Sequence, residues 1–160
     1  MIAEHYVADV LRESNTLNVL QSRAHGLDHW FRVWKNGQWL TTQSEIKDVD
    51  MEVVALFALF HDSMRVNEGN DPEHGTRGWL LWKYLYDGSG HTLTDIQDRQ
   101  LATACEDHSN GLTHSDPTIA ICWDADRLDI HRHGIWPDSH LMSTGAGQIL
   151  ALRRTYPGAT

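Results

Sequence analysis

The chain has 160 residues, of which 41% are hydrophobic and 22% are charged, and its formal net charge is −9. This length and composition predict one globular domain spanning residues 1–160. The negative charge disfavours binding to duplex nucleic acid, which requires a basic surface. It does not exclude anionic substrates, because a bound divalent cation can reverse the local field.

The sequence shows no sign of export or of insertion into a membrane. The longest apolar run, residues 53–60, is far shorter than a membrane span. Acidic and His residues interrupt the first ten positions, which argues against a secretory signal. Cys105 and Cys122 form no CxxC pair and are expected to be reduced thiols. We therefore expect a soluble cytoplasmic protein with no membrane partner.

Apolar residues recur at helical spacing along most of the chain. This spacing predicts helices over residues 2–12, from about 28 onward, 51–60, 75–86, 94–107, 116–129 and 148–154. Asn36-Gly37 either ends the second helix or weakens it midway. The segment 51–60 follows acidic residues and is rich in Met, Ala and Leu, which favours a buried helix over a strand. The irregular segment 134–147 is either a surface connection or a loop over a pocket.

A pair of strongly polar residues, His61-Asp62, ends the apolar segment 51–60. Burial of an unpaired imidazole and carboxylate is costly, so this pair needs a partner. A metal ion is one such partner, and a salt bridge or hydrogen-bond network is another. The dipeptide alone does not decide between them.

Two other segments carry polar residues on helix faces. His29 and Arg32 lie one turn apart, which would place an imidazole for a metal and a guanidinium for an anion on one face. In the segment 123–129, Asp126 lies on a largely apolar stripe. A carboxylate in that position is either paired or coordinating.

These motifs, taken in order, resemble the HD-domain superfamily of metal-dependent phosphohydrolases. The matching strings are His29-x-x-Arg32-Val33, His61-Asp62 and Ala125-Asp126-Arg127-Leu128. The resemblance covers about residues 26–129 and is nearest to small stand-alone bacterial HD proteins. It implies a compact all-α bundle of about six or seven helices. It also implies that the metal ligands are His29, His61, Asp62 and Asp126.

The resemblance leaves the number of metal ions open. Some HD proteins hold a second ion through two further His, and His74 and His108 occupy the corresponding interval, each at the end of a predicted helix. A helix-capping or surface role is the alternative for both. One or two divalent ions per chain are therefore expected. The mixed nitrogen and oxygen ligands suit Mn, Fe, Co, Ni or Zn.

A metal ion in such a site would polarise a phosphoryl oxygen and lower the pKa of a water molecule. The expected activity is hydrolysis of a phosphate ester or anhydride, and the expected partner is a small anionic phosphorylated substrate, a nucleotide or related molecule. The candidates for phosphate binding are Arg32, Arg65 and Arg77. The candidates for acid–base catalysis or for orienting a ligand are Asp62, Glu73, Glu106, Asp107 and Asp124. Asp124 is also the alternative to Asp126 as a ligand.

Two other functions fit the same motifs. A minority of HD proteins use four His and two Asp to hold two irons and act as oxygenases. A non-catalytic metal- or nucleotide-binding module is a further alternative. The stretch Ser63–Asn67 lacks the acidic residue that some nucleotide-cleaving HD enzymes carry after the central pair. Exposed aromatic residues on a small helical domain are compatible with a homodimer.

Overall fold

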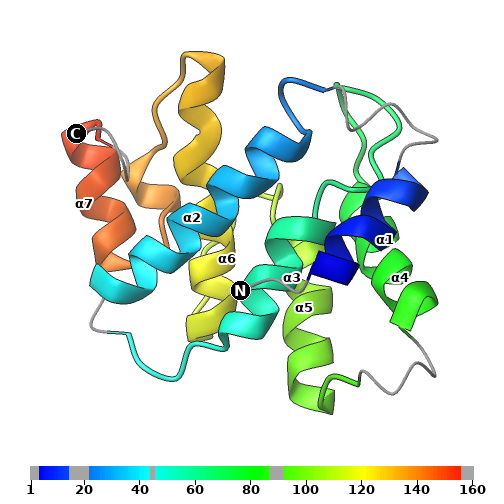
Figure 1. Cartoon of the computed structure of the whole chain (residues 1–160). Helices are drawn as coiled ribbons and strands as arrows, with labels where there is room; N and C mark the ends of the chain where they lie inside the picture. Colours follow the sequence, from blue (N-terminus) through cyan, green and yellow to red (C-terminus); the bar gives the residue numbers. More distant parts are fainter. Residues whose placement is uncertain (1–3, 15–21, 44–45, 87–91, 156–160) are drawn as a thin grey trace.

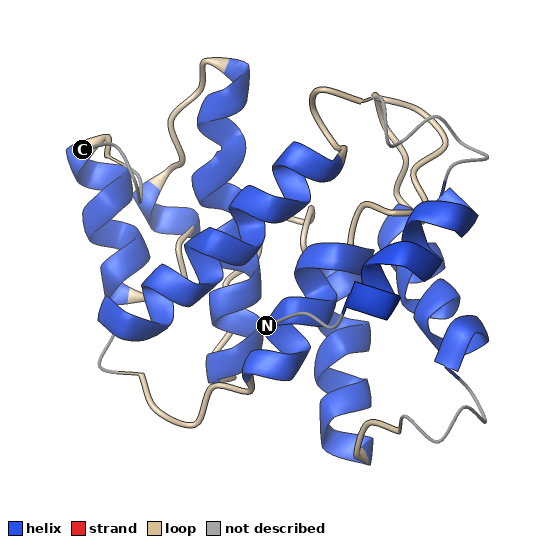
Figure 2. Cartoon of the chain, viewed as in Figure 1, coloured by secondary structure: helices blue, strands red, loops and turns tan. Residues whose placement is uncertain are grey.

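The structure is a computed structural model that describes residues 4–14, 22–43, 46–86 and 92–155. The α-helices are α1 (Glu4–Ser14), α2 (Leu27–Gln43), α3 (Met51–Phe60), α4 (His74–Tyr86), α5 (Asp95–Asp107), α6 (Pro117–Leu128) and α7 (Gly145–Arg153). Two short 3-10 helices are η3 (Asp129–His133) and η4 (Ser139–Leu141). The described residues form helices and loops without a strand (Figure 2), which confirms the all-α class. None of the described helices is long and apolar enough to cross a bilayer.

Helix α3 packs against α2, α5 and α6 and forms the centre of the described fold (Figure 1). The carboxylate of Asp50 caps its first turn by accepting hydrogen bonds from two backbone N–H groups. Every residue of the helix from Val53 to Phe60 is buried. The predicted buried helix is therefore confirmed. Its C-terminal end carries His61 and Asp62 into the interior, where both are buried.

Helix α2 continues through Asn36-Gly37, so of the two alternatives the end of the helix at this point is excluded. The side-chain amide of Asn36 donates to the backbone oxygen of Ala125 on α6, at 2.9 Å. A Cβ atom on Gly37 would lie 2.7 Å from a side-chain carbon of Val54 on α3. Both residues are typical of turns in isolation. Here they serve close packing of α2 on two neighbouring helices.

Helix α4 approaches its neighbours through two glycines. A Cβ atom on Gly75 would lie 1.8 Å from the backbone oxygen of Cys105, and one on Gly78 would lie 2.0 Å from that of Phe60. Backbone atoms held in a helix cannot move aside as a flexible side chain can. The close approach of α4 to α5 thus places His74, at the start of α4, beside His108, which follows α5.

We expect Gly75→Ala to destabilise the protein by about 1–3 kcal/mol, because the added methyl group overpacks the contact between α4 and α5. Urea denaturation followed by circular dichroism measures this loss. Gly145→Ala is the matched control, since nothing lies within 4 Å of a Cβ atom at that position. Equal stability of the two variants would contradict the inferred contact.

Candidate metal centre

Six side chains from widely separated positions meet in one cluster. They are His29 from α2, His61 and Asp62 from the end of α3, His74 from the start of α4, His108 from the end of α5, and Asp126 from α6. Five of these side chains are at most 4% exposed, and Asp126 is 17% exposed. The structure therefore brings together the four principal candidates and both candidates for a second ion.

The ligand atoms form two halves that share Asp62. In the first half, His29 Nε2 lies 3.1 Å from His61 Nε2, 3.4 Å from Asp62 Oδ2 and 3.2 Å from Asp126 Oδ1. In the second half, His74 Nε2 lies 3.0 Å from His108 Nε2 and 3.2 Å from Asp62 Oδ1. Ligand atoms about 2.1 Å from a common ion are separated by about 3.0–3.4 Å. Both halves are close to this spacing.

All four imidazole rings are oriented by a contact at Nδ1. The partner atoms are Asp129 Oδ2 for His29 (2.7 Å), Phe57 O for His61 (3.0 Å), Asp71 O for His74, and Cys105 O for His108 (2.7 Å). A carbonyl oxygen can only accept a hydrogen bond, so Nδ1 carries the proton and Nε2 of the neutral ring presents its lone pair. This is the arrangement in which histidines bind metal ions.

The converging atoms repel one another unless a cation or a proton lies between them. Burial lowers the pKa of His29, but hydrogen bonds to Asp126, Asp129 and Asp62 outweigh it and raise the pKa to about 10. For His61, burial dominates and lowers the pKa to about 3. Without a metal ion, one proton on His29 therefore offsets part of the negative charge. The donor set as a whole fits a divalent cation.

Arg65 brings a positive charge to the second half of the cluster. Its Nη1 atom lies 3.3 Å from Asp62 Oδ1 and 3.0 Å from His74 Nε2, and its side chain is 10% exposed. Nη2 donates to the backbone oxygen of Gly69, which holds the guanidinium in place. Of the three arginines predicted to bind phosphate, Arg65 is the one that reaches the cluster.

Asp129 contacts the cluster through His29, and the sequence alone did not identify it as a site residue. It orients His29 and also accepts hydrogen bonds from Arg32 Nε at 2.6 Å and Arg32 Nη2 at 3.1 Å. The guanidinium of Arg32 pairs with this buried carboxylate, and the phosphate-binding role of Arg32 stays a prediction. The available signal was the spacing of three between Asp126 and Asp129, which places both on one helix face.

Two further candidates contact residues outside the cluster. Arg77 Nη2 donates to both carboxylate oxygens of Asp71, at 2.7 and 2.6 Å, and so fixes the loop before α4. Its phosphate-binding role stays a prediction. Asp124 accepts hydrogen bonds from the backbone N–H groups of Ser143 and Thr144, at 2.7 and 2.8 Å. It anchors the segment before α7, and its role as a metal ligand or an orienting residue stays a prediction.

The three remaining acidic candidates, Glu73, Glu106 and Asp107, are exposed or partly exposed. Asp107 Oδ1 accepts a hydrogen bond from the side chain of Asn110, at 2.8 Å. Glu73 and Glu106 are exposed. Partial burial and the neighbouring Asp107 and Glu73 raise the pKa of Glu106. The acid–base role of these residues stays a prediction.

A cavity of about 330 Å³ opens beside the cluster and is lined by His108 and Asp126. Pro137, Asp138 and Leu141 line it as well. Of the two interpretations of segment 134–147, the structure thus supports the loop over a pocket.

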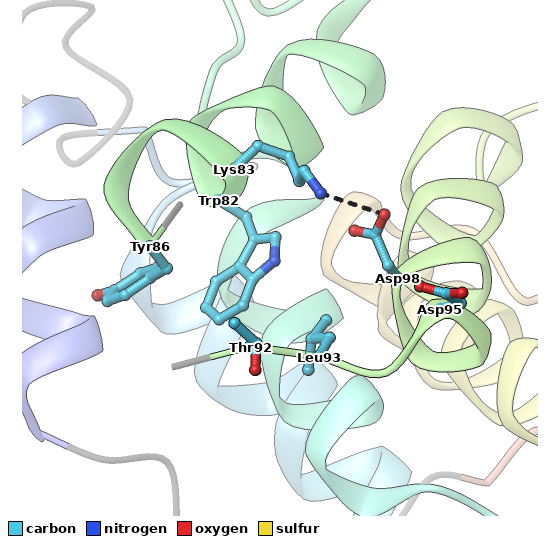
Figure 3. Close-up of a pocket in the computed structure, with 7 residues that line it drawn as sticks. All are labelled: Trp82, Lys83, Tyr86, Thr92, Leu93, Asp95 and Asp98. Carbon is cyan, nitrogen blue, oxygen red and sulfur yellow. Dashed lines mark hydrogen bonds and ion pairs between the residues drawn. The ribbon is translucent and has the colours of Figure 1, made fainter. Parts of the chain in front are cut away.

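A different, smaller pocket lies between α4 and the start of α5 and contains none of the cluster residues (Figure 3). Its Lys83 is paired with Asp98 at 3.3 Å. This second pocket therefore offers no comparable group of ligands.

The comparisons with known proteins agree with this architecture. No protein-family model and no curated protein matches the sequence. Among solved structures, the chain is similar to a predicted HD superfamily hydrolase from an uncultured Thermotogales bacterium, with a TM-score of 0.66 and 22% identity. The match covers 94% of this chain and 83% of that one. The two proteins share a fold, which confirms the compact all-α bundle predicted from the motifs.

We expect Asp129→Asn to weaken metal binding about 10–100-fold, because His29 loses the carboxylate that orients and polarises its ring. Isothermal titration calorimetry with Mn²⁺ measures this change. Asp124→Asn is the contrasting variant: it should lower the melting temperature and leave the metal affinity unchanged. If both variants lost the same affinity, the assignment of Asp129 to His29 would be wrong.

The metal-free protein should lose stability as the pH rises from 6.5 to about 10. The pKa of His29 is about 10 in the folded chain, against the ordinary value of 6.5 for histidine. The folded state therefore binds more protons in this interval, and the stabilisation present below pH 6.5 disappears as the pH passes through the folded pKa. Urea denaturation in EDTA across this range measures the slope. His29→Gln should reduce this slope, while His108, Cys105 and Cys122, whose pKa values are also raised, keep part of it. A slope unchanged by the substitution would contradict the raised pKa of His29.

Proposed function

We propose that this protein is a metal-dependent phosphohydrolase that cleaves a phosphate ester or anhydride of a nucleotide or related small molecule. The observation that carries the proposal is the convergence of four imidazole Nε2 atoms and two carboxylates beside an open cavity. The fold shared with a predicted HD superfamily hydrolase supports the same reaction class.

The six ligands form two candidate metal positions, which we expect to differ in affinity for a divalent ion. His29, His61, Asp62 and Asp126 would hold the first ion, with two carboxylates among four ligands. Asp62, His74 and His108 would hold a second ion, but the guanidinium of Arg65 already contacts two of these ligands. Like charges repel in a buried site. We therefore propose that the first position binds a divalent ion, of Mn, Fe, Co, Ni or Zn, more tightly than the second.

The bound metal would supply Lewis-acid polarisation of the phosphoryl group and a lowered pKa for the attacking water. In the reaction, the oxygen of water forms a bond to phosphorus and the bond from phosphorus to the leaving oxygen breaks. The leaving oxygen takes up one proton from the water. Asp62 and Asp126 stay ionised, since contacts with the neighbouring His hold their pKa values low despite burial. Burial of the other ligands restricts the approach of water to the cavity beside Asp126.

A diiron oxygenase is the second candidate function. It is favoured by one observation: all six ligands that this chemistry uses in HD proteins meet in the cluster, and Asp62 faces both halves with one oxygen each. The positive charge of Arg65 in the second half argues against equal occupation of the two positions.

The test is a screen of nucleotides and simple phosphate esters against Mn²⁺, Fe²⁺, Co²⁺, Ni²⁺ and Zn²⁺. We expect the wild type to release phosphate with at least one of these metals and His61→Ala to release none. Metal content of protein purified without oxygen is measured in parallel, with Asp62→Ala as the variant that should lose the metal. Two irons per chain and no phosphate release with any metal would overturn the hydrolase and favour the oxygenase.

A further inference from the structure

The cavity beside the cluster is the side from which a ligand can reach the candidate metal position. Asp126 is the most exposed of the six ligand side chains, and together with His108 it forms part of the cavity lining. The opposite walls come from η3, η4 and the segment between them. A molecule bound in this cavity would therefore lie against the candidate metal centre.

Arg132 gives this cavity a positive charge that its surroundings only partly neutralise. Its Nε atom donates to the backbone oxygen of Ala24 at 2.7 Å, and Nη1 lies 3.6 Å from Asp129. The same carboxylate already forms the closer ion pair with Arg32, at 2.6 Å. One carboxylate cannot neutralise two guanidinium groups. Because the side chain of Arg132 is only 14% exposed, solvent screens the remaining charge weakly.

A second guanidinium, that of Arg127, lines the cavity and donates its hydrogen bonds to uncharged backbone oxygens. Its Nη1 donates to the backbone oxygen of Leu141 at 2.5 Å, and Nη2 donates to that of His108 at 3.5 Å. The group lies 5.5 Å from the centre of the Trp123 ring. Asp138 also lines the cavity, but its carboxylate accepts a hydrogen bond from the backbone N–H of His140.

The rest of the wall is apolar and comes from Ile130, Pro137 and Leu141. The lining also holds two carboxylates, those of Asp138 and of the candidate metal ligand Asp126. With a metal ion bound to Asp126, the two guanidinium groups and the apolar wall fit a molecule with a dianionic end and an organic end. Its volume, about 330 Å³, is near the lower limit for small-molecule sites. This size favours one phosphate attached to a single ring or sugar over a longer polyphosphate.

We propose that this cavity is the substrate subsite, in which Arg132 and Arg127 hold the phosphate of a small phosphate monoester and the apolar wall packs against its organic group. The inference rests on the proposed function and narrows it to monoesters. Arg132 and Arg127 are added to the arginines predicted from the sequence, and guanidinium groups suit phosphate binding because they offer paired donors.

The test measures binding of inorganic phosphate to the Mn²⁺-loaded protein by calorimetry, without any turnover. Arg132→Met removes the charge and should weaken phosphate binding about tenfold or more, with unchanged metal content. Arg153→Met, on α7 and away from this cavity, is the control and should bind phosphate as the wild type does. Unchanged phosphate affinity in Arg132→Met would overturn the inference.

A second pair of variants tests the cavity without touching Arg132. Leu141 is 40% exposed and contributes its side chain to the wall, so substitution there should be tolerated. Leu141→Glu should repel phosphate, whereas Leu141→Gln, of the same shape, should retain binding. With 4-nitrophenyl phosphate as substrate, both Leu141→Glu and Arg132→Met should raise KM.

The outcomes separate the subsite from the reaction. If phosphate binding depends on Arg132 but the protein hydrolyses no ester, the result would support the subsite and contradict the proposed hydrolase function. Hydrolysis with an unchanged KM in Arg132→Met and Leu141→Glu would support the hydrolase and overturn the subsite.

Discussion

The candidate site depends on one constraint: each of four buried imidazoles has its Nδ1–H held by a fixed acceptor, so that its Nε2 lone pair points inward. The rings cannot turn away to relieve the mutual repulsion of their lone pairs and the adjacent carboxylates. The cluster is therefore a preorganised cation site, and little ordering is left to be done when an ion binds. The pKa of His29 is raised because the surrounding carboxylates stabilise a positive charge at this position.

The packing of the fold serves this constraint. A wholly buried α3 carries His61 and Asp62, and the neighbouring helices approach it closely enough to bring the other ligands within hydrogen-bond distance. Gly37 and Gly78 permit two of these approaches, one bringing α2 onto α3 and the other bringing α4 onto α3. The small residues at the helix contacts therefore allow the polar residues in the centre to come within contact of one another.

The sequence was sufficient to predict the fold and the identity of the residues that converge. The motif order indicated His29, His61, Asp62 and Asp126, and even the less specific His74 and His108 reach the cluster. It was not sufficient to predict partners across helices. Asp124 and Asp129 are both buried acids near Asp126, but which faces His29 depends on how α2 crosses α6. The ion pairs of Arg32 and Arg77 were not foreseen for the same reason, since a guanidinium pairs with whichever carboxylate the packing brings near it.

Three of the four imidazoles are oriented by backbone oxygens, those of Phe57, Asp71 and Cys105, and only His29 relies on a side chain. A backbone oxygen is present whatever amino acid occupies the position. Mutations at these three positions can therefore change the residue and keep the orienting bond, provided the helix or turn remains. The backbone conformation therefore determines much of the geometry of the site. Proteins that share this fold can differ widely in sequence at these positions and still orient the same histidines.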